Sequence, residues 1–234
     1  MFEISVIIPC YNEERNLIKI VEAINHLKSN NQIKIEFIIV NNGSTDNTKD
    51  ILKNLSHEEY LKYINLERNA GYGGGIIAGI KKSKAKIIAW THGDIQCDIG
   101  DVIIGYNKFK KDLDLNKSIV KGFRVNRRFI DSFFSKLMEI TASIVFLKNF
   151  KEINAQPKLF NKKLFKFFKN SPNDFSLDLF LLYTAKKNNL NINEFPVYYK
   201  KREYGYSKGG DSFIGKFKLS LRSLKYIFKL RFNL

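Results

Sequence analysis

The residues best suited to chemistry lie in one segment, Trp90–Asp98, with the sequence WTHGDIQCD. It follows the apolar run 87–89 and brings His92, Asp94 and Gln96 to a predicted strand end. Mg²⁺ and Mn²⁺ prefer oxygen ligands and often take only one or two carboxylates, while substrate phosphates and water complete the shell. Sites of this kind usually have two carboxylates that bracket one residue, and here His92 stands in the first place. The sequence predicts Asp94 as a ligand of Mg²⁺ or Mn²⁺ and leaves open whether His92 binds the ion or a water.

Three other polar segments also follow predicted strands: 9–12, 41–46 and 70–75. Ligands of parallel α/β sheets bind at the carboxyl ends of the strands, so we expect these segments to meet the segment 92–98 at one edge. Segment 41–46 could bind a base and ribose, or simply form a turn and a helix cap. The glycines at 71–75 could present backbone N–H groups to an anion, or allow a helix to pack closely. A dinucleotide fingerprint is not supported, since no acid follows at a suitable distance.

Elements of two kinds alternate along the first half of the chain. Short apolar strands are predicted at 4–8, 35–40, 63–66, 87–91 and 118–121, with helices between them. This alternation predicts an α/β fold with a mostly parallel central sheet and helices on both faces. The second half is less regular, and its apolar spacing predicts helices at 129–147, 177–187 and 213–230.

Charge is distributed unevenly between the two halves. Residues 1–117 hold 16 Lys/Arg and 15 Asp/Glu, whereas residues 118–234 hold 24 and 8, so nearly all of the net charge of +17 lies in the second half. Such a half suits an anionic partner, either a phosphorylated substrate or an acidic lipid; the lysine bias of an AT-rich genome is the alternative. We expect no nucleic-acid partner, because there is no basic recognition helix or stacking motif.

A cationic stripe runs along the last predicted helix, formed by Lys218, Arg222, Lys225 and Lys229 beside Phe and Leu side chains. A helix of this type can lie on an anionic membrane without crossing it. Packing on the core or in a homo-oligomer is the alternative. The longest apolar run, 140–147, is far shorter than the roughly 18–20 residues of a membrane span. With only two cysteines and no recognisable signal peptide, we expect a cytoplasmic protein that is peripheral on the inner face of the cell membrane.

Six segments together resemble a known family: VIIPCYNEERNL, FIIVNNGSTDNT, NAGYGGGIIAGI, HGDIQCD, INAQPKLF and LDLFLLYTAKKNNLNINEFPVYYKKREYGYSKGG. In this order they resemble the family 2 glycosyltransferases of GT-A fold, in particular the dolichyl- or polyprenyl-phosphate sugar transferases and bacterial surface-polysaccharide glycosyltransferases. The resemblance covers about residues 4–210. It implies a GT-A domain at 1–210 followed by a basic amphipathic helix at 211–234.

The resemblance also implies an activity: the inverting transfer of a sugar from a nucleoside-diphosphate sugar, assisted by a divalent cation. By their positions in the motifs, the implied donor-binding residues are Pro9, Tyr11, Asn12, Glu13, Asn42, Ser44, Gly73, Asp94 and Gln96. Asn42 stands where the family usually has an acid that contacts the base, which leaves uracil and guanine both open. Asp94 matches the second carboxylate of the metal motif, and His92 replaces the first.

The implied acceptor site holds the phosphate of a polyprenyl phosphate or a lipid-linked glycan. The residues that match it are Arg124, Arg202, Ser207 and Lys208. Asp178 matches an acid near the acceptor, and it would be the general base for a hydroxyl acceptor or an orienting group for a phosphate acceptor. Two alternatives remain open: the same fold with a soluble hydroxyl acceptor, and a nucleotide-sugar-binding pseudoenzyme, prompted by the missing carboxylate at position 92.

Overall fold

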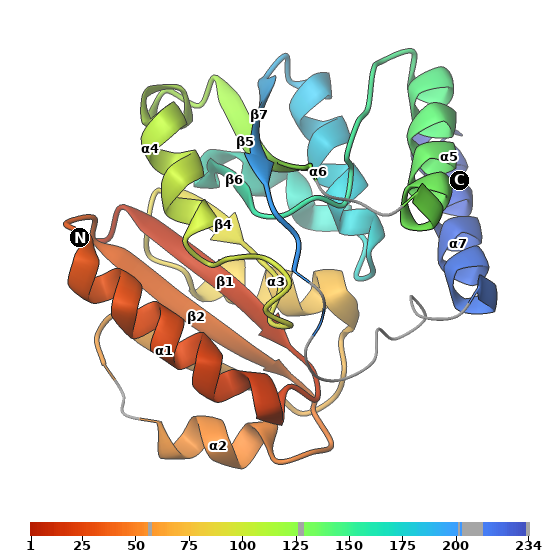
Figure 1. Cartoon of the computed structure of the whole chain (residues 1–234). Coiled ribbons are helices and arrows are strands. Elements are labelled where there is room, and N and C mark those ends of the chain that lie inside the picture. Colours follow the sequence, from red (N-terminus) through yellow and green to blue (C-terminus); the bar gives the residue numbers. More distant parts are fainter. Residues whose placement is uncertain (56–57, 126–128, 201, 203–212, 233–234) are drawn as a thin grey trace.

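The structure is a computed structural model of the 234-residue chain, and it describes residues 1–55, 58–125, 129–200, 202 and 213–232. Figure 1 shows one central sheet with helices on both faces. Its strands are β1 (Ile4–Cys10), β2 (Ile35–Asn42), β3 (Leu61–Leu66), β4 (Ile87–Trp90), β5 (Ser118–Arg124), β6 (Lys158–Asn161) and β7 (Asn191–Val197). The α-helices are α1 (Glu14–Asn30), α2 (Thr48–Asn54), α3 (Gly71–Lys82), α4 (Asp101–Asp114), α5 (Phe129–Phe146), α6 (Ser176–Lys187) and α7 (Phe213–Phe232), and a 3₁₀ segment covers Lys162–Asn170.

The sheet has the strand order β3-β2-β1-β4-β6-β5-β7. Strand β6 runs antiparallel to both of its neighbours, and the other pairs are parallel. Six strands therefore end at the same edge of the sheet. Because β6 runs the other way, the edge where the others end is the edge where β6 begins. The predicted α/β class with a mostly parallel sheet is confirmed.

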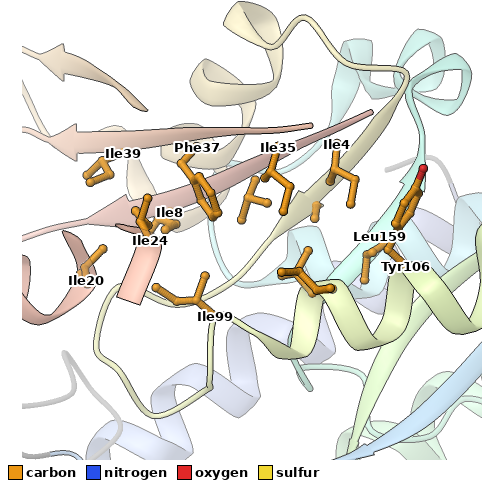
Figure 2. Close-up of a cluster of buried hydrophobic side chains, with 14 of the residues drawn as sticks. Ile4, Ile8, Ile20, Ile24, Ile35, Phe37, Ile39, Ile99, Tyr106 and Leu159 are labelled. Atoms are coloured by element: carbon orange, nitrogen blue, oxygen red, sulfur yellow. The ribbon is translucent and has the colours of Figure 1, made fainter. Parts of the chain in front are cut away.

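Apolar side chains cover both faces of the strands, which explains the apolar runs Val6–Ile8 in β1 and Phe37–Val40 in β2. On one face, α1, α2 and α4 pack on the sheet; α1 contributes Leu17, Ile20 and Ile24 at helical spacing. Figure 2 shows part of this cluster, with Ile8 of β1 near Ile20 and Ile24 of α1. On the other face, Ile7 of β1 belongs to a second cluster, to which α3, α5, α6 and α7 contribute. These two layers fix the strand ends on which the site is built.

Helices α5 and α7 lie side by side at one end of the molecule (Figure 1). Both leave large apolar side chains exposed: Phe133, Leu137, Ile140 and Ile144 on α5, and Phe217, Leu221, Phe228 and Phe232 on α7. On α7 the buried side is thin, since Ile227 is its one fully buried side chain among those described. Within the described part of the chain, no helix has the length and apolarity that crossing a membrane requires.

Two strands were not predicted from the sequence. Strand β6 is only four residues long, with the sequence KLFN, and its charged residue Lys158 is buried. Strand β7 contains Pro196 and alternates exposed and buried residues as an edge strand. Neither has the continuous apolar run that identified the other strands. The helices predicted at 129–147, 177–187 and 213–230 are confirmed to within two residues at each end.

Candidate active site

A cavity of about 610 Å³ opens at the edge of the sheet where the parallel strands end. One wall consists of the segments that follow β1, β2, β3 and β4, including Tyr11, Asn42, Tyr72 and Asp94. The opposite wall consists of residues from β5, α6 and the segment after β7. The cavity then continues to α5 and α7, where it is lined by Ser135, Met138, Leu219, Ser220, Arg222 and Ser223. The four polar segments that the sequence placed at one edge therefore line a single cavity.

Asp94 lies at the floor of this cavity and is 8% exposed. Its Oδ1 accepts a hydrogen bond from the backbone N–H of Gln96 at 3.1 Å, which fixes the carboxylate on its own turn. Its Oδ2 forms an ion pair of 2.5 Å with the guanidinium of Arg202. Arg202 follows β7, more than one hundred residues further along the chain. Its partner in the structure is the predicted metal ligand, and this places it at the corner of the cavity expected to hold the metal.

His92 lies between two aromatic rings, with its centroid 5.8 Å from that of Tyr72 and 6.5 Å from that of Tyr199. Burial lowers the pKa of His92, although Asp94 and Asp178 oppose the shift. The imidazole is therefore neutral at pH 7, and this is the form in which histidine binds metal ions. His92 also lines the cavity, on the same short segment as Asp94.

The donor set here fits a divalent cation that takes most of its ligands from a substrate. Among the residues described, no three His, Cys, Asp or Glu side chains lie close enough to enclose a metal ion. Asp94 and the neutral His92 would supply two ligands, and diphosphate oxygens and water would complete the shell of Mg²⁺ or Mn²⁺. The guanidinium of Arg202 pairs with Oδ2 of Asp94, so a metal ion that binds this oxygen has to displace it.

Glu13 is a second carboxylate near this corner. Burial, together with the nearby negative charge of Asp94, raises the pKa of Glu13 to about 7, although a hydrogen bond from Asn16 opposes the shift. Glu13 begins the turn into α1 and lines the cavity. At neutral pH it is therefore divided between its neutral and charged forms.

Most of the predicted donor-binding residues line the cavity, and three do not. Pro9, Tyr11, Glu13, Asn42, Asp94 and Gln96 lie on its wall. The exceptions have other contacts: the hydroxyl of Ser44 accepts from the backbone N–H of Asn12 at 3.0 Å, so these two join the segments that follow β1 and β2. Gly73 packs against the backbone, where an added Cβ would come within 2.5 Å of the carbonyl oxygen of Pro172. Its place in the sequence reflects close packing.

Asn42 has a positioning role within the protein. Its amide donates to the carbonyl oxygen of Gly71 at 2.9 Å and accepts from the backbone N–H of Ala70 at 3.0 Å. Both side-chain groups therefore hold the turn that precedes α3. This turn carries Tyr72, whose ring stacks on that of Phe175 at a centroid distance of 4.6 Å. The amide of Asn42 shapes the wall of the cavity through these contacts.

Of the residues predicted to bind the acceptor phosphate, Arg124 lies on the far wall of the cavity. Its Nε forms an ion pair of 2.5 Å with Glu152, and its guanidinium lies 5.3 Å from the centroid of Tyr199. The Nη2 atom is buried without a hydrogen-bond partner. A guanidinium that is fixed by these contacts and still has an N–H group without a partner can donate to an anion. Ser207 and Lys208 lie outside the described residues.

Asp178 lies in the first turn of α6 and is 1% exposed. Three donors converge on its Oδ1: the amide of Gln156 at 3.0 Å, the indole N–H of Trp90 at 3.3 Å and the ammonium of Lys158 at 3.3 Å. Its Oδ2 has no hydrogen-bond partner, although the residue lines the cavity. One oxygen of this carboxylate therefore has three donors, and the other is buried with an unused capacity to accept a hydrogen bond.

Sequence reasoning gave no role to Gln156, Lys158, Trp90 or Tyr72. Gln156 connects three of the elements, because its amide donates to Tyr72 Oη at 2.9 Å as well as to Asp178. Burial lowers the pKa of Lys158, and the charge of Asp178 opposes the shift. The available signal was the segment INAQPKLF, in which a lysine and a glutamine adjoin apolar residues that read as buried.

Comparison with known proteins decides the family. A model of the family described as "Glycosyl transferase family 2" matches residues 5–180 of the chain. This chain belongs to glycosyl transferase family 2. Its curated relatives include the dodecaprenyl-phosphate galacturonate synthase of Rhizobium johnstonii, 31% identical over 54% of this chain and 37% of the relative. They also include the dolichyl-phosphate beta-glucosyltransferase ALG5D of Trichomonas vaginalis, 30% identical over 68% of this chain and 53% of the relative. The chain thus spans between about a third and about half of these proteins.

Solved structures show that the fold of this family 2 transferase is a known one. The glucosyl-3-phosphoglycerate synthase of Mycobacterium tuberculosis, in complex with phosphoglyceric acid, superposes with a TM-score of 0.73 at 14% identity, covering 100% of this chain and 81% of that one. The same enzyme with Mn²⁺, UDP and glucosyl-3-phosphoglycerate gives a TM-score of 0.70 at 15% identity, again over 100% and 81%. These neighbours are glycosyltransferases, and they confirm the predicted GT-A-like architecture.

Proposed function

We propose that this chain is an inverting glycosyltransferase that moves a sugar from a nucleoside-diphosphate sugar to a polyprenyl phosphate or a lipid-linked glycan. The observation that carries the proposal is the shape of the cavity, which starts at Asp94 and ends at the exposed apolar helices α5 and α7. A nucleotide-sugar fits at the strand ends, and a lipid phosphate fits at the helical end. Relatives named for dodecaprenyl- and dolichyl-phosphate as the acceptor support the choice.

One set of residues would stabilise the leaving diphosphate, and another set would bind the acceptor. Asp94, with His92, would hold a Mg²⁺ or Mn²⁺ ion against the donor diphosphate, and neighbouring structures contain Mn²⁺ with UDP. When bound, this cation supplies Lewis-acid stabilisation of the negative charge on the leaving diphosphate. Arg202 adds a second positive charge at the same corner. Fixed charges of this kind stabilise the charge that develops as the sugar–phosphate bond breaks.

A phosphate acceptor is already an anion and needs cations to hold it rather than a base. Arg124, with its free Nη2, and Arg222 of α7 line the acceptor end of the cavity. With such an acceptor, no proton has to leave the nucleophile, so Asp178 would orient a hydroxyl instead of removing a proton. With a hydroxyl acceptor, the free Oδ2 of Asp178 would take its proton.

We further propose that α5 and α7 place the cavity on the inner face of the cell membrane, as a peripheral contact. The exposed apolar side chains of the two helices adjoin Lys218, Arg222, Lys225 and Lys229, all exposed on α7. Lysine and arginine side chains reach headgroups while apolar side chains enter the acyl boundary. The membrane contact would bring the lipid acceptor to the mouth of the cavity.

The proposed function is tested with the full chain, UDP- and GDP-linked sugars, Mn²⁺ and vesicles that contain undecaprenyl phosphate. Sugar recovered on the lipid, together with released nucleoside diphosphate, is the expected result. Omitting the metal should abolish transfer, and omitting the lipid phosphate should do the same. Transfer to water-soluble hydroxyl acceptors alone, or binding of a nucleotide-sugar without any turnover, would contradict the proposal and favour one of the two alternatives.

A further inference from the structure

A buried charge pair lies directly behind the cavity wall. The ammonium of Lys158 is 3.3 Å from Oδ1 of Asp178, and the two residues are 0% and 1% exposed. Burying two charges is costly unless further hydrogen bonds satisfy them. The ammonium also donates to the carbonyl oxygen of Ala155 at 2.7 Å. Lys158 itself does not line the cavity, whereas Asp178 does.

The three donors on Asp178 all act on the same oxygen. Lys158, Gln156 and Trp90 bind Oδ1, and none of them binds Oδ2. The carboxylate plane is therefore set by donors from β4, from β6 and from the residues just before β6. The negative charge is further stabilised because Asp178 occupies the N-terminal turn of α6. The remaining oxygen has a fixed direction and an unused capacity to accept a hydrogen bond.

We propose that Lys158 is a positioning residue that, through Oδ1, orients Asp178 so that Oδ2 accepts a hydrogen bond from a hydroxyl of the transferred sugar. This inference rests on the proposed function and adds a residue to it. The pair is electrically neutral as a whole, so an anionic acceptor can approach Asp178 without facing an uncompensated charge. Two further titratable groups near Asp178 are Tyr72 of α3, which is half-buried, and His92, which is neutral at pH 7.

The antiparallel strand makes this arrangement available. Because β6 starts where its neighbours end, Gln156 and Lys158 reach the site edge from the opposite chain direction. Gln156 also donates to Tyr72, so the orientation of Asp178 is joined to the wall of the cavity that would contact the donor. A small rotation of the carboxylate would misplace the sugar, and an error of about 1 Å in such a contact can cost on the order of 10²-fold in rate.

The test compares Lys158→Met, Asp178→Asn and the double variant in the full chain. A matched control is Lys162→Met, since Lys162 also donates to a backbone carbonyl, that of Ser83 at 2.6 Å, but does not line the cavity. We expect Lys158→Met to lower kcat for transfer to undecaprenyl phosphate at least ~10-fold, while the Kd of UDP or GDP with Mn²⁺ changes less than about twofold. In the Asp178→Asn background, Lys158→Met should produce no further loss, because its effect passes through Asp178.

Thermal unfolding supplies a second measurement that does not depend on catalysis. Lys158→Met leaves a buried carboxylate unpaired, so its Tm should lie below that of the double variant, which has no buried charge at this place. If Lys158→Met does not fold, the double variant and Asp178→Asn should still have equal kcat. Wild-type kcat in Lys158→Met, additive losses in the double variant, or a Tm of the double variant no higher than that of Lys158→Met would each overturn the positioning role. A wild type that transfers no sugar would instead overturn the proposed function, and the Tm comparison would still test the pair.

Discussion

Arg202 forms an ion pair with Asp94, the carboxylate that the sequence predicts as a metal ligand, and this pairing should affect metal binding. Its ion pair of 2.5 Å with Asp94 competes with any cation that binds the same oxygen. We expect Arg202→Ala to bind Mn²⁺ more tightly than the wild type when nucleotide is absent, because the ion no longer displaces a guanidinium. The same variant should transfer sugar more slowly, since it lacks one positive charge near the leaving group.

Calorimetric titration with MnCl₂ measures the first effect. Lys200→Ala is the control, because Lys200 is largely exposed and lies 3.9 Å from Asp98, outside the cavity. Weaker Mn²⁺ binding by Arg202→Ala, or an equal change in Lys200→Ala, would show that Arg202 and the metal do not share Asp94.

Glu13 gives the stability of the protein a pH dependence of known sign. Burial raises the pKa of Glu13 to about 7 in the folded chain, from an ordinary value of 4.5. The unfolded chain therefore loses this proton at lower pH than the folded one, so the contribution of Glu13 to stability decreases as the pH rises from about 4.5 to about 7. Glu13→Gln removes the titration, and its free energy of unfolding relative to the wild type should increase over this range.

Urea unfolding at pH 5 and pH 8 measures this difference. Glu22→Gln is a suitable control in helix α1, because Glu22 is exposed and does not line the cavity. A constant difference between Glu13→Gln and the wild type at the two pH values would contradict the assigned burial of this carboxyl.

At the scale of elements, the sequence predicted the parallel strands β1 to β5 and the long helices, and it missed β6 and β7. These strands were found because both of their faces are buried, which leaves continuous apolar runs such as Phe37–Val40. Strand β6 has four residues, and the buried ammonium of Lys158 interrupts the apolar pattern. The ammonium of Lys158 pairs with Asp178, which is distant in sequence, and donates to the backbone carbonyl of Ala155. The residues of the strand itself therefore give no sign that this lysine is buried.

The site divides in the same way. His92, Asp94 and Gln96 were found because they follow a strand in one short segment, and the strand-end rule brings such segments together. The ion pair between Asp94 and Arg202 joins residues 108 positions apart and depends on how the chain returns after β7. Asn12, Ser44 and Gly73 do not line the cavity, and the contacts described for them are with the protein itself. Their residue types alone do not show whether they also contact a nucleotide.

Helix α7 carries the prediction that concerns the membrane. Each exposed lysine or arginine near an anionic surface contributes about 1 kcal/mol to adsorption. Reversing two charges, Lys225→Glu with Lys229→Glu, should therefore lower the affinity for vesicles containing phosphatidylserine by more than ~10-fold. The matched control reverses two exposed lysines of α4, Lys108→Glu with Lys111→Glu, on the opposite face of the sheet.

Vesicle co-sedimentation at low and high salt gives the readout. Binding should require anionic lipid and weaken as salt is added, because exposed charges are screened. Equal losses in the α4 and α7 variants would mean that the net charge of +17 acts without a defined contact surface. No binding at low salt would remove the membrane contact altogether.

At the scale of the whole molecule, two hydrophobic layers hold the strand ends of one sheet at a common edge, and the second half of the chain closes the cavity over it. The near-neutral first half supplies Asp94 and its segment. The basic second half supplies Arg124, Arg202 and α7. Under the proposed function this division would account for the charge asymmetry, since a donor diphosphate, an acceptor phosphate and a lipid surface are all anionic.

The most direct measurement compares the wild type with Asp94→Asn for transfer of a radiolabelled sugar to undecaprenyl phosphate, in vesicles with Mn²⁺. Asparagine keeps the shape of the side chain and removes its charge, so the fold should be retained, as unfolding curves can verify. We expect Asp94→Asn to lower turnover by at least ~10²-fold, the scale of losing one main electrostatic stabiliser. Turnover by a folded Asp94→Asn variant within a few-fold of the wild type would contradict the assignment of this cavity as the site of sugar transfer.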